Sequence, residues 1–124
     1  MRNLIKKGVC ALLTADEAIQ ALVNDRIFLS RTGDEVPSPF IVTSQFTSQF
    51  ARTKSGSYLD AVTFRVDCVA KSSDVAEQLA ASVKRVLDGA FLPDVGMLFV
   101  TSVSDDYLFE QDSFVLSLDF ILEL

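Results

Sequence analysis

Hydrophobic and polar residues alternate most regularly between residues 60 and 71. The apolar positions are Val62, Phe64, Val66, Cys68 and Ala70, and the residues between them include Thr63, Arg65 and Asp67. A period of two places the apolar side chains on one face of a β-strand and the polar ones on the other. The pattern predicts a strand of an antiparallel sheet, with one face toward the core and the other toward water or a partner.

A second alternating stretch, residues 113–124, predicts the last strand of the chain. One face carries Phe114, Leu116, Leu118, Phe120 and Leu122, and the other carries Ser117, Asp119 and Glu123 together with Val115 and Ile121. Shorter apolar stretches predict strands at residues 27–29, 40–46 and 97–103. Residues 40–50 and 59–71 are joined by a polar segment, which predicts a long hairpin with a projecting tip.

Three stretches have the period of an amphipathic helix. Residues 1–13 place Leu4, Ile5, Val9, Leu12 and Leu13 on one face. Thr14 and Glu17 have the spacing of a capping box, which predicts a short second helix with Ala18, Ile19, Leu22 and Val23 inward. Residues 72–74 predict the start of a third helix, which continues to about residue 88 and is followed by Gly89.

The predicted order is therefore α-α-β-β-β-α-β-β. With 124 residues, of which 49% are hydrophobic, the chain forms one domain over residues 1–124 and can bury a core. The third helix has to cover a sheet face. We expect an α+β fold, a two-layer sandwich in which helices pack on one face of a mostly antiparallel sheet of four to five strands.

Apolar residues remain on the side of the sheet that these helices leave open, namely Phe99, Val115 and Ile121. Several exposed apolar residues on one patch indicate a partner surface, although a loop covering this side or a different strand register would also account for them. The hairpin tip carries Phe50, Arg52, Lys54 and Tyr58. We expect this tip to contact another protein, because two cations are too few to hold nucleic acid tightly.

Charge is divided unevenly along the chain. Residues 1–85 hold all 11 basic residues, whereas residues 86–124 hold none and carry eight acids, Asp88, Asp94, Asp105, Asp106, Glu110, Asp112, Asp119 and Glu123. A surface of this sign argues against binding to duplex DNA. Four of the acids, Asp105, Asp106, Glu110 and Asp112, fall in a predicted turn over residues 104–112, where they would hold Mg²⁺ or Ca²⁺, act as an acid–base pair, or simply solvate a hairpin.

Other chemistry is scarce. The chain has no histidine, which excludes Cys–His and Ser–His–Asp nucleophiles, and its five glycines form no phosphate-binding motif. Cys68 falls among alternating apolar residues and is expected to be buried, while a disulfide to Cys10 stays open. We therefore expect no enzyme activity, cofactor or metal. The longest apolar run, residues 9–13, is too short to span a membrane.

The whole chain resembles the tail completion and tail terminator proteins of long-tailed bacteriophages and prophages. Four stretches carry the resemblance: a helix followed by Asp25-Arg26-Ile27-Phe28, the strand Pro39-Phe40-Ile41-Val42, the strand at residues 62–70 followed by a helix at 72–88, and a last strand with Asp119-Phe120 inside it. The resemblance covers nearly all 124 residues. None of these stretches is a catalytic signature.

The resemblance implies a subunit of a six-fold ring at the head-proximal end of the tail tube. Such a ring ends tube polymerisation, joins the tail to the head connector and lets DNA pass without specific binding, so the expected location is the virion, after assembly in the host cytoplasm. Its partners would be further copies of the chain, the tail tube protein and the connector protein, with no membrane. Some of Asp105, Asp106, Glu110 and Asp112 would then face the channel, and Phe50, Arg52, Lys54 and Tyr58 would contact the tube or a neighbouring subunit. Three alternatives stay open: a head–tail connector or stopper ring, a monomeric acidic metal-binding or enzymatic domain, and a ligand-binding domain.

Overall fold

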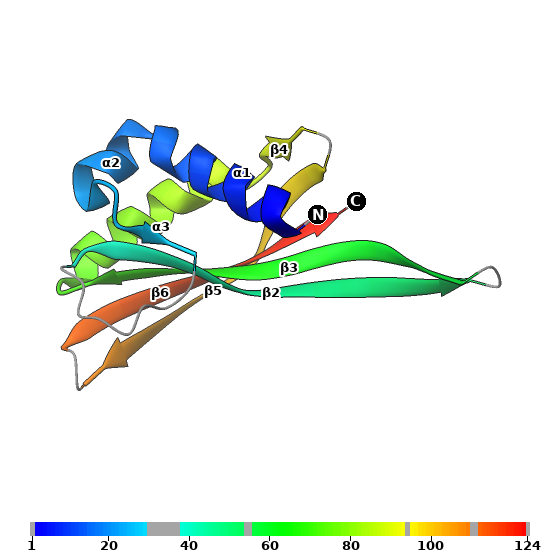
Figure 1. The fold of residues 1–124 in the computed structure, drawn as a ribbon. Helices are drawn as coiled ribbons and strands as arrows, with labels where there is room; N and C mark the ends of the chain where they lie inside the picture. Colours follow the sequence, from blue (N-terminus) through cyan, green and yellow to red (C-terminus); the bar gives the residue numbers. More distant parts are fainter. Residues whose placement is uncertain (1, 30–37, 54–55, 94, 110–111, 124) are drawn as a thin grey trace.

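The computed structural model describes residues 2–29, 38–53, 56–93, 95–109 and 112–123. Three helices lie together over one face of a single six-stranded sheet (Figure 1). The elements in chain order are α1 (Arg2–Ala15), α2 (Glu17–Val23), β1 (Ile27–Phe28), β2 (Phe40–Thr53), β3 (Gly56–Ala70), α3 (Ser73–Leu87), β4 (Phe91–Leu92), β5 (Gly96–Leu108) and β6 (Ser113–Glu123).

The sheet has the strand order β1-β2-β3-β6-β5-β4, in which β1 runs parallel to β2 and every other neighbouring pair is antiparallel. The α+β class, the helices on one face and the mostly antiparallel pairing are confirmed, but the expected number of four to five strands is wrong, because the sheet has six. The additional strand, β4, has two residues, and only its pairing with β5 at Gly96 and Met97 identifies it. The sheet also extends beyond the helices (Figure 1), so the two layers coincide only over its middle.

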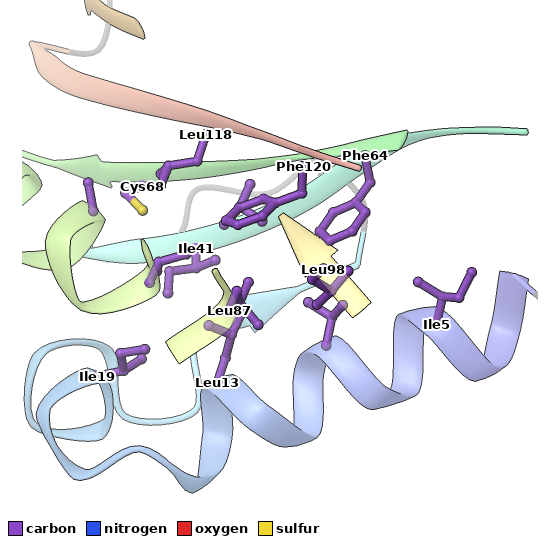
Figure 2. Packing of buried hydrophobic residues seen from close by; sticks show 14 of the residues in the cluster. Ile5, Leu13, Ile19, Ile41, Phe64, Cys68, Leu87, Leu98, Leu118 and Phe120 are labelled. Carbon is purple, nitrogen blue, oxygen red and sulfur yellow. The ribbon is translucent and has the colours of Figure 1, made fainter. Parts of the chain in front are cut away.

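The core lies between the helices and the inner face of β3 and β6. All five apolar residues predicted for the inner face of β3 are buried. On β6, Leu118, Phe120 and Leu122 are buried, while the remaining two, Phe114 and Leu116, are half-buried near the end of the strand. Figure 2 shows Leu13 of α1 pointing toward Leu87 of α3, beneath the sheet residues.

The helix boundaries differ slightly from those predicted. Helix α1 continues through Ala15, so Thr14 is inside it and the predicted capping box does not form. Asp16 is the N-cap of α2 instead, and its carboxylate accepts a hydrogen bond of 3.1 Å from the Ile19 N–H. Leu4, which was expected to face inward, has 59% of its surface exposed.

The end of β5 contradicts the predicted acidic turn. Residues 104–108 continue the strand and pair with β6, so the turn is confined to residues between Leu108 and Ser113. Tyr107 explains the difference, because its ring packs 4.9 Å from that of Phe114, its partner on β6. This aromatic pair favours strand over turn despite the neighbouring aspartates.

The hairpin of β2 and β3 projects from the body as a two-stranded arm (Figure 1). Strand β6 pairs with β3 from Ala61 to Ala70, and β1 pairs with β2 at Ile41 and Val42. Beyond these positions, among the described residues, β2 and β3 have no strand beside them other than each other. The predicted long hairpin is confirmed.

A row of aromatic rings lies at the base of the arm. Phe46 stacks on Phe64 with 5.1 Å between ring centroids, and Phe64 stacks on Phe120 at 5.4 Å. Phe46 reaches this face because one extra residue, Gln45 with a φ of 57°, interrupts the pairing between Ser44 and Thr47 and reverses the alternation of β2. The row joins the arm to the core across three strands.

Candidate assembly interface

The arm presents two predicted contact residues to solvent. Phe50 has 64% of its surface exposed, and Arg52 is exposed as well. They are two residues apart on β2, opposite Leu59 and Ser57 of β3, so their side chains share one face of the arm. Lys54 lies outside the described residues, and Tyr58 is described only as a backbone position of β3.

The open face of the sheet does not form one continuous apolar patch. Phe99 of β5 and Ile121 of β6 are register partners, and Met97 lies two residues from Phe99 on the same face. Phe99 is 39% and Met97 41% exposed. Val115 lies apart from them, beside Val69 of β3. The structure therefore brings together two of the three predicted residues and separates the third.

A polar band divides these apolar residues. The Arg65 guanidinium donates to the Asp119 carboxylate over 2.8 Å and 3.3 Å, and the Ser102 hydroxyl donates to the same carboxylate over 2.8 Å. Beside them, the Ser117 hydroxyl donates to Asp67 over 2.6 Å. The hydrogen bonds from Arg65 lower the pKa of Asp119 below its ordinary value, so this carboxylate is charged at neutral pH. The open face of the sheet therefore carries both polar and apolar side chains, and its apolar residues are not continuous.

The four acids of the predicted turn do not converge. Asp105 is the register partner of Leu116 and Asp106 of Val115, so their side chains lie on opposite faces of the sheet. The Asp106 carboxylate accepts from the Tyr107 N–H over 2.8 Å, and the Tyr107 hydroxyl donates to Asp112, which raises the pKa of Tyr107. Glu110 lies outside the described residues. Across the described part of the chain, no three His, Cys, Asp or Glu residues form a group that would hold a metal ion.

Sequence reasoning missed an aromatic cluster at the far end of β5 and β6. The ring of Tyr107 lies 4.8 Å from that of Phe109 and 4.9 Å from that of Phe114, and Phe109 is 86% exposed. The aromatic residues were visible in the sequence but were placed in a turn. The strand pairing of Tyr107 with Phe114 is what gathers them on one surface.

The two thiols offer no reactive group. Cys68 is buried as predicted and Cys10 is half-buried, and both are free. Burial raises the pKa of each thiol above its ordinary value, which keeps both protonated. No helix in the described ranges is long and apolar enough to cross a membrane.

Comparison with protein families matches residues 7–122 to the tail completion protein gp17 family. The chain belongs to this family. It is accordingly a structural, tail-related virion protein and not an enzyme. The fold is also similar to that of a solved chain from the "Virion of native gene transfer agent (GTA) particle", with a TM-score of 0.84, 18% sequence identity and coverage of 98% of this chain and 95% of that chain. A search of curated protein sequences finds no significant match.

Proposed function

We propose that this member of the tail completion family forms a ring, six subunits in number, that closes the head-proximal end of a phage tail tube. The ring stops further addition of tube subunits and presents a surface to the head connector. The observation that carries the proposal is the two-stranded arm, which extends beyond the core with Phe50 and Arg52 exposed at its outer part. A solvent-exposed aromatic next to an arginine is a favourable composition for a protein interface.

The family membership and the similarity to a chain of a virion particle support this proposal. Phe99, Ile121 and Val115 are proposed as a second set of contact residues, divided by the Arg65–Asp119 band. The polar band would add directionality to the apolar contacts, because a buried ion pair tolerates few alternative registers.

The proposal also covers passage of DNA through the ring without specific binding. Residues 86–124 contain no basic residue, so any wall they form repels phosphates. Asp105 and Asp106 lie on opposite faces, and a single wall cannot use both. We assign the channel to the face of Asp106 and leave Asp105 outside it. Asp112 is left outside as well, because its carboxylate accepts from the Tyr107 hydroxyl and Tyr107 lies on the face of Asp105. Charge reversal at this position, Asp106→Lys, should slow DNA passage while the ring still assembles, and unchanged infectivity would contradict this assignment.

Deletion of residues 51–57 tests the role of the arm. The shortened protein should keep its helical and sheet circular dichroism, because the core residues lie elsewhere, but it should no longer stop growth of purified tail tubes. The matched control is the full-length chain with Arg52→Lys, which keeps the positive charge. Tubes capped equally well by the deletion variant would refute the role of the arm.

Binding to purified tail tubes and to portal complexes distinguishes a tail terminator from a head–tail connector. A terminator binds the end of purified tail tube, whereas a head–tail connector or stopper protein binds the portal complex. We expect retention on tubes and none on the portal complex alone, and the reverse result would make the chain a connector protein.

A further inference from the structure

The outer edge of β5 carries unpaired main-chain groups near the acidic end. Leu98 directs its N–H and C=O away from β6, since they bond to Ala90 and Gly89 over 2.8 Å and 2.7 Å. The register between β5 and β6 shifts by one residue between Val100 and Ser102. Alternation along an antiparallel strand then turns the main-chain groups of Val103, Asp105 and Tyr107 outward. No strand among the described residues pairs with this part of β5.

The outer edge of β2 in the arm has the same property. Ile41 directs its N–H outward, to the Arg26 carbonyl at 3.0 Å. The extra residue Gln45 shifts the alternation of β2 once. The second shift, between Gln49 and Phe50, has its extra residue on β3 and leaves the alternation of β2 unchanged, so the outward positions of the arm include Phe50 and Arg52. Within the described ranges, β1 covers this edge only at Ile41 and Val42. The arm thus offers a free strand edge whose outward residues are an aromatic and a cation.

The two edges match each other in order and spacing. Phe50 and Arg52 are two residues apart, and so are Asp105 and Tyr107. In an antiparallel pair that aligns Arg52 with Asp105, Phe50 falls opposite Tyr107, so a cation meets an anion and an aromatic meets an aromatic. Directly opposite side chains of these kinds stabilise a strand pair. Phe50 would also join the cluster of Tyr107, Phe109 and Phe114, whose Phe109 is 86% exposed.

We propose that the arm of one copy of this chain adds to the β5 edge of a second copy, antiparallel, with Arg52 opposite Asp105 and Phe50 opposite Tyr107. The inference rests on the ring proposed above and supplies its subunit contact. Strands β2 and β5 lie on opposite sides of the β3–β6 pair, so donor and acceptor are different surfaces of each subunit. Such a head-to-tail contact generates a closed ring when its rotation closes. In this register the Arg52–Asp105 pair supplies two main-chain hydrogen bonds. The Phe50–Tyr107 pair supplies one, from the Phe50 N–H to the Tyr107 carbonyl, because the Tyr107 N–H already donates to the Asp106 carboxylate.

Complementary charge reversal tests this contact. Arg52→Glu and Asp105→Lys each place like charges in every junction of a one-component ring, so each variant alone should associate at least about tenfold more weakly than the wild type. An equimolar mixture should recover association, because in an alternating ring every junction is either Arg52 with Asp105 or the reversed pair. The chain carrying both substitutions should also recover it. Sedimentation velocity measures association, and circular dichroism confirms that each variant is folded.

Ser104→Lys is the matched control, since Ser104 is exposed and adjacent to Asp105 in sequence but lies on the other face. It should leave association unchanged and should not rescue Arg52→Glu. If the wild type forms rings and the Arg52→Glu and Asp105→Lys variants form rings of the same mass, this contact is wrong and the ring stands. A mixture of the two variants that stays dissociated would also overturn the contact and leave the ring standing. A wild-type chain that never associates, free or on tail tubes, would instead remove the ring, and this contact with it.

Discussion

Replacing Phe64 by Ala is the sharpest probe of how the arm is joined to the body. Phe64 is 1% exposed and lies between the rings of Phe46 and Phe120, at 5.1 Å and 5.4 Å (Figure 2 shows Phe64 beside Phe120). Truncating a fully buried phenylalanine removes its transfer free energy and leaves a cavity, which together cost about 3–5 kcal/mol. Two stacked neighbours place this site toward the upper part of that range.

A domain of this size is stable by about 5–15 kcal/mol, so the variant folds if the wild type lies above the lower end of this range, and it should unfold at markedly lower urea concentration. Unfolding is followed by far-UV circular dichroism at several protein concentrations, because association would add its own stabilisation. The control is Phe50→Ala, on the exposed arm, which should change the free energy of unfolding by less than about 0.5 kcal/mol. A loss below about 1 kcal/mol for Phe64→Ala, or one equal to that of the control, would refute the aromatic row as the anchor of the arm.

Two further predictions concern β5 and β6. Asp119→Asn should cost about 1 kcal/mol at pH 7, a value suited to a partly exposed ion pair with Arg65. Because the pKa of Asp119 is lowered in the folded state, its contribution to the free energy of unfolding is present above about pH 4 and is lost as the pH falls through the folded pKa. The free energy of unfolding of the variant, measured with urea, should therefore fall less steeply at acid pH than that of the wild type. Identical acid dependences would contradict the pairing. Gly96→Ala should cost several kcal/mol, since the added Cβ would lie 2.3 Å from a backbone carbonyl oxygen of β6, whereas Gly8→Ala, whose Cβ meets the end of a leucine side chain at 2.9 Å, should be nearly neutral in thermal unfolding.

Periodicity predicted those parts of the fold where packing repeats along the chain. The alternation in β3 and β6 and the apolar stripe of α3 each span several repeats, so burial of one face determines the element and its orientation. The strand β4 has only two residues, which is too short for any alternation of apolar and polar positions, and it is defined by its pairing with β5. The parallel pairing of β1 with β2 also depends on the path of the chain between them, which no local pattern records.

The candidate interface could be predicted only on its donor side. A polar segment between two alternating stretches indicates a hairpin tip, which correctly placed Phe50 and Arg52 on the arm. The acceptor edge, which is the outer edge of β5, could not be predicted from the sequence for a physical reason. The direction of the main-chain groups of Asp105 and Tyr107 is set by a one-residue shift near Thr101, and aspartates at these positions favour a turn when read alone.

The mass of the assembled protein tests the account most directly. Native mass spectrometry of the free chain, and imaging of tail tubes incubated with it, should show a closed ring of about 82 kDa, six times the 13.6 kDa of one chain, with one ring at one end of each tube. A protein that stays at 13.6 kDa in solution and leaves tube ends bare and still growing would contradict it.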